Sequence, residues 1–126
     1  MTLEVALSHR FAGFTMELSF AAPPGVTALF GPSGSGKTTV VNAVAGLMRP
    51  ERGRVVLDGR VLTDSAAGTH VPPHRRRIGY VFQDARLFPH LTVRQNLLYG
   101  RFFAPKGEGP TLPRIADLLG LGPLLA

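Results

Sequence analysis

The sequence contains no cysteine, and it has no apolar run long enough to span a membrane. Without cysteine the chain can form neither a disulfide framework nor a thiolate metal site, which fits a reducing compartment. A bilayer-crossing helix needs about 20 consecutive apolar residues, and the longest apolar runs here are far shorter. The opening MTLEVALSHR lacks the basic start and apolar stretch of a signal peptide. We therefore expect a soluble chain that can still dock on a membrane protein.

Acidic residues are scarce, with 8 Asp and Glu against 14 Lys and Arg, so the net charge is +6. The densest basic cluster is Arg75-Arg76-Arg77, and such clusters can neutralise nucleic-acid phosphates. The other arginines are spread thinly, and no aromatic residues interleave with the triplet to form a stacking platform. The pattern argues against a nucleic-acid partner. The 126 residues, 44% of them hydrophobic, are enough for one folded domain.

Two antiparallel hairpins are predicted. Residues 14–20, FTMELSF, alternate between apolar and polar side chains, as a half-buried strand does, and LEVAL at 3–7 is its expected partner. Phe14 belongs to the apolar face and is expected in the core. The second hairpin is predicted around Asp58-Gly59, because Asp-Gly between two short β runs favours a two-residue turn.

Two apolar runs predict further strands. VTALF at 26–30 is apolar throughout, as a strand buried on both faces in the middle of a sheet would be. IGYVF at 78–82 is expected to return to strand after a polar loop at 63–77, which contains Pro72-Pro73.

Three helices are expected from apolar periodicity, over residues 38–47, 91–100 and 112–121. Gly46 and Pro50 mark the end of the first helix. Thr92 is the candidate N-cap of the second helix and Gly100 its stop. Pro113 suits the first turn of the third helix.

The segment GPSGSGKT, residues 31–38, matches G-x-x-x-x-G-K-[ST] at every fixed position. Glycines let backbone N–H groups turn inward around an anion, and the N-terminus of the following helix adds partial positive charge. Lys37 can reach the β- and γ-phosphates, and the Thr38 hydroxyl can ligate Mg²⁺. With a strand expected before the loop and a helix after it, an ordinary Gly/Ser turn is the weaker interpretation. The expected nucleotide-binding residues of this segment are Gly31, Ser33, Gly34, Ser35, Gly36, Lys37, Thr38 and Thr39.

Three segments together resemble the ATP-binding subunits of ABC transporters: GPSGSGKTT, GRVVLDG at 53–59 and RRRIGYVFQDARLFPHLTVRQNL at 75–97. The third segment is most similar to the molybdate importers of that family. The resemblance implies an α/β fold, namely a P-loop NTPase core of the ABC ATPase type with an N-terminal antiparallel β subdomain. It implies ATP and Mg²⁺ as cofactors and uptake of a small oxyanion, molybdate. It also implies a dimer that sandwiches ATP, a membrane permease as partner, and the cytoplasmic face of a bacterial inner membrane.

The same resemblance assigns roles to single residues. Gln83 would lie in the Q-loop, close to Mg²⁺ and the attacking water, and the loop after it would contact the permease. Phe11, in the turn of the first hairpin, is the expected partner of the adenine ring. Asp58 ends an apolar run as a Walker B aspartate does, but Gly59 follows it, so Asp58 is interpreted as a turn residue.

Asp84, Arg86 and His90 fall on the expected permease-facing loop, where they can also be simply solvated.

The resemblance divides the chain into residues 1–30, a front hairpin with the strand leading into the P-loop; 31–47, the P-loop and its helix; 53–100, a hairpin, the Q-loop and a helix; and 111–126, the start of a helical subdomain. The sequence holds no LSGGQ signature, no apolar strand ending in Asp-Glu and no switch histidine. We therefore expect an N-terminal portion, incomplete at its C-terminus. In the family the Asp-Glu strand pairs with the strand before the P-loop, so residues 26–30 would keep an unpaired edge.

Such a chain is expected to be marginally stable or aggregation-prone, and to bind ATP–Mg²⁺ weakly with negligible hydrolysis. Two other readings stay open. One is a P-loop kinase of a small metabolite, which would leave residues 80–93 unexplained. The other is a non-catalytic nucleotide-binding remnant.

Overall fold

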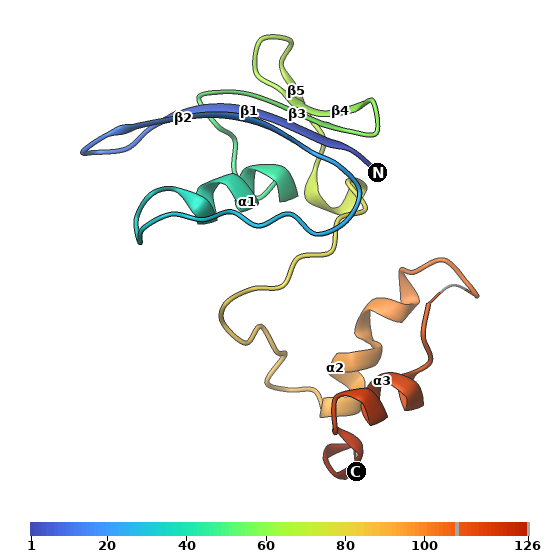
Figure 1. The fold of residues 1–126 in the computed structure, drawn as a ribbon. Coiled ribbons are helices and arrows are strands. Elements are labelled where there is room, and N and C mark those ends of the chain that lie inside the picture. Colours follow the sequence, from blue (N-terminus) through green and yellow to red (C-terminus); the bar gives the residue numbers. More distant parts are fainter. Residues whose placement is uncertain (108, 126) are drawn as a thin grey trace. The chain divides into compact units, whose positions relative to one another are not determined.

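A computed structural model describes residues 1–107 and 109–125, which form two compact units, one spanning Met1–Val81 and the other starting at Phe82. The first unit contains a five-stranded antiparallel sheet in the order β2-β1-β3-β4-β5 (Figure 1). The strands are β1 (Leu3–Arg10), β2 (Thr15–Ala22), β3 (Arg52–Leu57), β4 (Arg60–Asp64) and β5 (Thr69–His70).

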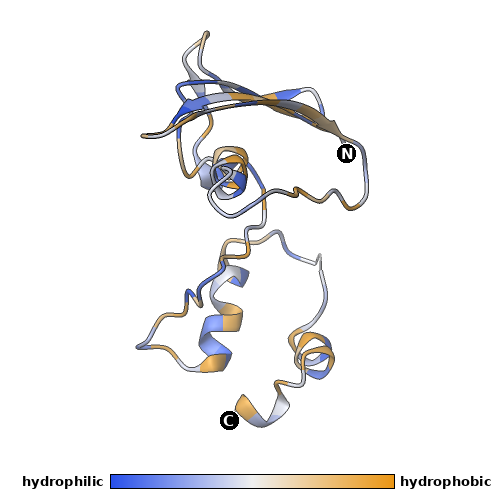
Figure 2. Cartoon of the chain, turned by 60° about the vertical axis from the view of Figure 1, so that its left-hand side comes forward, coloured by the Kyte–Doolittle hydropathy of each residue, from blue (hydrophilic) through white to orange (hydrophobic). Residues whose placement is uncertain are grey.

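One face of this sheet packs against the helix α1 (Lys37–Ala45), as Figure 2 shows. The alternation predicted within residues 14–20 holds in β2, where Met16 is buried and the polar residues on either side of it are exposed. The predicted partner strand is confirmed, because Leu7 on β1 pairs with Leu18 on β2. Apolar side chains from the strands and from α1 form one core, because each element has an apolar side to bury. This core cluster consists of Val5, Leu7, Met16, Val40, Ala43, Val55 and Leu62.

The predicted turn at Asp58-Gly59 is confirmed. Both residues have positive φ, 49° at Asp58 and 78° at Gly59, as a two-residue type I′ turn between β3 and β4 requires. The Asp58 carboxylate accepts a hydrogen bond of 2.7 Å from the backbone N–H of Thr2. Asp58 therefore acts as a turn residue that ties the hairpin to the start of β1.

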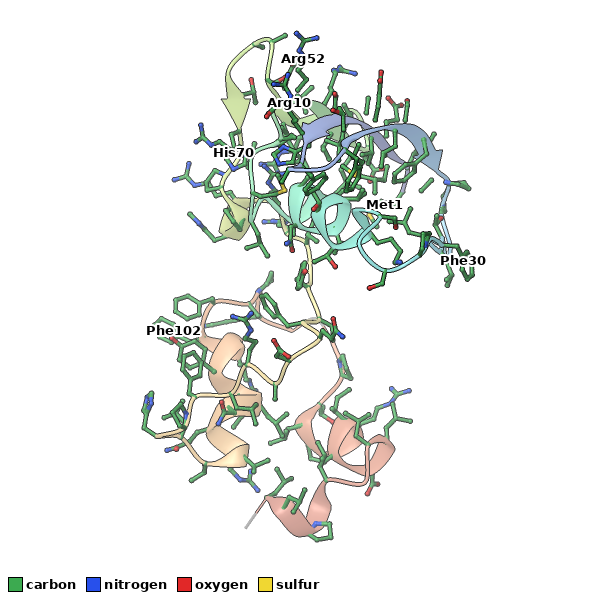
Figure 3. The ribbon with its side chains drawn as sticks, turned by 90° about the vertical axis from the view of Figure 1, so that its left-hand side faces the viewer. Met1, Arg10, Phe30, Arg52, His70 and Phe102 are labelled. Atoms are coloured by element: carbon green, nitrogen blue, oxygen red, sulfur yellow. The ribbon has the colours of Figure 1, made fainter. Side chains whose placement is uncertain are left out.

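The two apolar runs predicted as strands, 26–30 and 78–82, are not strands in the structure. Val26 and Val81 are essentially fully exposed, and Phe30 is 94% exposed and projects from the chain (Figure 3). A strand exists only where a neighbouring backbone supplies its hydrogen bonds, and neither run belongs to the sheet of the described residues. Apolar composition marked both runs as strands, but neither run forms a ladder with a strand of residues 1–107 or 109–125.

Two smaller expectations are also corrected. Phe14 is 44% exposed and is not part of the core cluster, because it precedes β2 and stacks on Phe11 in the turn. The segment 63–77 is not purely loop: it holds the end of β4, the short β5 and a 3₁₀ turn, η1 (Pro73–Arg75).

The second unit is helical, with α2 (Val93–Leu98), η2 (Tyr99–Phe102), α3 (Leu112–Leu118) and η3 (Gly122–Leu124). Thr92 caps α2 as predicted: its side chain accepts from the Gln95 N–H, and the Gln95 side chain accepts from the Thr92 N–H. Gly100 does not stop the helical segment, which continues through Phe102 as a 3₁₀ turn. No helix formed by residues 1–107 and 109–125 has the length and apolarity that a membrane crossing requires.

Candidate functional site: the phosphate loop

Residues 31–36 form a tight loop that leads directly into α1. Gly34 and Gly36 have φ of 80° and 98°, in the left-handed region that favours glycine. The Ser35 N–H donates to the Pro32 carbonyl over 3.1 Å, which closes the turn. A Cβ on Gly31 would lie 2.7 Å from Ser35 Oγ, and one on Gly36 would lie 2.5 Å from Met16 Sδ. The glycine pattern therefore follows from both backbone conformation and space.

Lys37 is the first residue of α1, and its side chain folds back over the loop. Its Nζ donates to the carbonyl oxygens of Gly31 and Pro32, the second over 2.9 Å. The N-terminal end of α1 carries partial positive charge at the same place. An ammonium group and a helix N-terminus thus converge on one glycine-rich turn, which suits an anionic ligand.

The hydroxyls of the loop also fit a polyphosphate. Ser35 Oγ is buried and has no hydrogen-bond partner, the one such side-chain atom among the described residues. A buried polar atom without a partner is costly, and a ligand oxygen would supply one. Thr38 and Thr39 follow Lys37 in the first turn of α1, and Thr38 is exposed there. Ser33 is exposed at the tip of the loop.

Phe11, the expected adenine partner, lies in the turn between β1 and β2. Its ring stacks on Phe14 at 4.8 Å with an interplanar angle of 21°, and His9 meets its edge at 5.1 Å. Phe11 is partly buried against the core cluster, whereas Phe14 is the more exposed member of the stack. The contact between Phe11 and adenine stays a prediction.

Gln83 belongs to the second unit, whereas Thr38 belongs to the first. Gln83 is exposed and lies in a segment without helix or strand. The Arg86 guanidinium lies over the ring of the preceding residue, Phe82, at 4.6 Å from its centroid. The joint role of Thr38 and Gln83 at a metal stays a prediction.

Asn96 fixes the loop that follows Gln83, although no role was predicted for it from the sequence. Its Oδ1 accepts from the Phe88 N–H over 2.8 Å, and its Nδ2 donates to the carbonyls of Phe88, Leu91 and Thr92. Two signs were available: asparagine has a low propensity for helix interiors, and Asn96 lies in the segment 75–97 that carries the resemblance. Asn96 holds residues 88–92 against α2.

A second residue missed by the sequence is Arg76. The basic triplet 75–77 reads as a surface cluster, but the Arg76 side chain is 1% exposed while its two neighbours are exposed. Nearby, the Tyr80 hydroxyl donates to Asn42 Oδ1 on α1 over 2.6 Å. The segment that leads toward Gln83 is therefore attached to the helix of the phosphate loop.

A glycine-rich loop that runs into a helix N-terminus, with Lys37 and Thr38 at the start of that helix, defines the class of P-loop nucleotide-binding proteins. The comparison with known families narrows the class. The chain belongs to the ABC transporter family, whose model matches residues 16–123.

Curated relatives are similar over nearly the whole chain. The molybdenum import ATP-binding protein ModC of Rhizobium etli is 57% identical over 126 residues, which cover 99% of this chain and 36% of that relative. The ModC proteins of Mesorhizobium japonicum and Paramagnetospirillum magneticum are 55% and 51% identical, over 99% and 98% of this chain and 34% of each relative. The chain thus spans about a third of the length of the curated relatives it matches.

A solved structure supports the fold. The dimeric, post-hydrolysis structure of the ATP-binding cassette MJ0796 bound to ADP and Pi matches with a TM-score of 0.57 and 25% identity, over 95% of this chain and 55% of that chain. The fold class predicted from the sequence, an ABC-type ATPase core with an N-terminal antiparallel β subdomain, is confirmed.

Proposed function

We propose that this chain provides the ATP-binding part of a bacterial ABC importer, with molybdate as the transported oxyanion. The phosphate loop carries the proposal, because its glycines, Lys37 and the orphaned Ser35 hydroxyl suit a polyphosphate. The transported substrate is inferred from relatives that are 51–57% identical and bear the name of molybdenum import ATP-binding proteins.

In this proposal the backbone N–H groups of residues 34–36 and the Lys37 ammonium hold the β- and γ-phosphates of ATP. The Thr38 hydroxyl and Gln83 are the residues that would hold Mg²⁺, which, when bound, neutralises charge on the phosphates. Phe11 would stack on adenine, with Phe14 extending the aromatic surface.

The proposed partners are a membrane permease and a second ATP-binding subunit. The loop after Gln83, with Asp84, Arg86 and His90 exposed along it, is proposed to contact a membrane permease at the cytoplasmic face of the inner membrane. A second ATP-binding subunit would complete the sandwich around ATP, and the similar cassette structure is dimeric.

The 126 residues by themselves are proposed to bind ATP–Mg²⁺ with little or no turnover. Phosphoryl transfer needs a metal, an in-line water and charge stabilisation at the same time. The phosphate loop supplies the binding part of that requirement, but no Asp-Glu strand or LSGGQ segment is among these residues.

Equilibrium binding of MgATP to wild-type chain and to Lys37→Ala tests the nucleotide site. Removing the ammonium should weaken binding at least about tenfold, because a charge-assisted contact to phosphate is lost. Lys106→Ala, which removes the other lysine of the chain, is the matched control and should bind like wild type. Equal affinity of Lys37→Ala and wild type would refute the proposed site.

Hydrolysis should be measured with the chain alone and with the remaining two-thirds of a ModC relative added in trans. Stimulated turnover that Lys37→Ala abolishes supports an ABC ATPase. Phosphate transfer to a small metabolite would instead support a kinase, and binding without turnover in either mixture would support a nucleotide-binding remnant.

A further inference from the structure

Arg76 has the largest side chain among the fully buried residues that the structure describes. Its guanidinium donates through Nε to the Val71 carbonyl over 2.7 Å, and through Nη1 to the carbonyls of Ala43 and Val44, each over 3.2 Å. Its Nη2 donates to Thr63 Oγ1 over 2.9 Å and lies 3.3 Å from His70 Nδ1. A guanidinium has five N–H groups. Four protein oxygens accept from it, and His70 Nδ1 is a fifth acceptor in the tautomer that leaves this nitrogen unprotonated.

These acceptors come from different elements. Ala43 and Val44 lie in the last turn of α1, Thr63 lies on β4, and His70, labelled in Figure 3, lies on β5. The cation therefore sits at the negative end of the α1 dipole, where it is favourable. No carboxylate of the described residues forms an ion pair with it. Arg76 joins the C-terminus of α1 to the far edge of the sheet.

Gly46 makes room for this arrangement. It ends α1 with φ of 83°, and its N–H donates to the Ala43 carbonyl over 3.2 Å. A Cβ at this position would lie 2.4 Å from Arg76 Nε and 2.8 Å from Cζ. The helix end and the guanidinium are thus fitted to each other, which a merely solvated arginine would not require.

The other end of α1 is also held from the sheet. Met16, 6% exposed on β2, packs so closely on Gly36 that a Cβ there would lie 2.5 Å from its sulfur. Between the two ends, Tyr80 donates to Asn42 on α1. Contacts at both ends of this nine-residue helix oppose tilting and sliding, and the first residue of the helix is Lys37.

We propose that Arg76 is a positioning residue for the phosphate loop: it holds α1 from behind so that Lys37 and Thr38 stay in register with the loop glycines. This role rests on the proposed nucleotide function. The attachment of α1 to the sheet does not depend on that function, and it can be tested without nucleotide.

Hydrogen exchange of the unliganded chain tests the attachment. In Arg76→Met, the amides of residues 40–46 should exchange at least about tenfold faster, while those that pair β1 with β2 keep most of their protection. Arg75→Met makes the same change at the exposed neighbour and should leave both sets unchanged. If Arg76→Met does not fold, Thr63→Val removes one acceptor and should loosen α1 in the same direction. If Arg76→Met folds and its α1 amides exchange at the wild-type rate, the proposal is overturned. If only Thr63→Val folds, a wild-type exchange rate of its α1 amides overturns the proposal as well.

Affinity for MgATP tests the positioning. Val56→Ala is the stability control, since Val56 is buried on β3 outside the core cluster. At temperatures where both variants are equally folded, Arg76→Met should bind about tenfold more weakly than Val56→Ala. Arg76→Lys keeps the charge but loses the planar fork, and should recover part of the affinity. Equal affinity of Arg76→Met and Val56→Ala would overturn the positioning role.

The two proposals fail in different ways. If wild-type chain binds no MgATP, the nucleotide function fails and the positioning role falls with it, while the exchange result still decides the attachment of α1. If wild type binds and Lys37→Ala does not, but Arg76→Met binds like its stability control, the nucleotide function stands and the positioning role alone is refuted.

Discussion

Each of the two units of the chain is stabilised internally by a different kind of interaction. The core cluster lies entirely within residues 1–81, and Val55 and Leu62 are completely buried there. Among the described residues of the second unit, Ala116 is the one buried hydrophobic residue. By contrast, Phe102, labelled in Figure 3, is 86% exposed and Leu118 is 78% exposed. The first unit depends on contacts between segments far apart in sequence, and the second depends mainly on local ones.

This difference shows which contacts position each part of the proposed site. The phosphate loop takes its position from β2 through Met16 and from β4 and β5 through Arg76. The loop after Gln83 takes its shape from its own neighbours in sequence, through Asn96 and the Thr92 cap. Damage to the sheet should therefore reach the phosphate loop, while damage to a cap should stay local.

Leu62→Ala should have the largest effect and would show whether the first unit is one cooperative structure. Deleting a fully buried leucine side chain costs about 2–5 kcal/mol, through lost burial and the cavity left behind. Thermal unfolding with hydrogen exchange in both units measures it. Leu118→Ala, at a largely exposed position, should change stability by less than about 0.5 kcal/mol. Similar losses in the two variants would contradict the contrast.

Thr92→Ala should have a smaller effect that remains within the second unit. It removes one half of the capping box of α2 and should cost about 0.5–2 kcal/mol of local stability. In hydrogen exchange, the α2 amides should exchange faster than in wild type, while the exchange rates of the amides that pair β1 with β2 should stay unchanged. Thr111→Ala is matched to it, because Thr111 precedes α3 without a side-chain cap hydrogen bond. Equal effects at both positions would show that capping does not hold this unit.

Mild acid should have the smallest effect and should act on the first unit alone. Burial, and then the charges of Arg76 and Arg49, lower the pKa of His70 below its ordinary 6.5. The folded state therefore binds fewer protons at His70 than the unfolded state does. Stability contributed by neutral His70 is present above the unfolded pKa, falls as the pH drops below 6.5, and is fully lost below the folded pKa.

Melting temperatures between about pH 7.5 and about pH 5 check this expectation. The carboxylate of Asp64, on the strand β4 that pairs with the strand of His70, has partners other than His70. It lies 3.7 Å from Arg54 and accepts from the N–H groups of residues 66 and 67. His70→Gln should flatten the fall, whereas His74→Gln, at an exposed position on η1, should not. A slope that persists in His70→Gln would assign it to other groups.

Local features of the fold could be predicted from the sequence, because their causes are local. The Asp58-Gly59 turn and the Thr92 cap depend on residues within a few positions of each other, and the glycines of the phosphate loop form a contiguous motif. Features that depend on distant partners could not. Residues 26–30 have strand composition but pair with no strand in the part of the chain that the structure describes. Nothing in the triplet 75–77 distinguishes the buried Arg76 from its exposed neighbours.

The folded-back Lys37 has a consequence for selectivity. Its ammonium already donates to the carbonyls of Gly31 and Pro32, so a ligand that enters the loop exchanges acceptors instead of meeting a bare charge. A neutral or singly charged group gains little from that exchange, since the carbonyls already satisfy the cation. A triphosphate offers several charged oxygens at once and gains from the exchange. In the proposed nucleotide site, the loop would therefore favour a ligand of high charge density over a neutral or singly charged one.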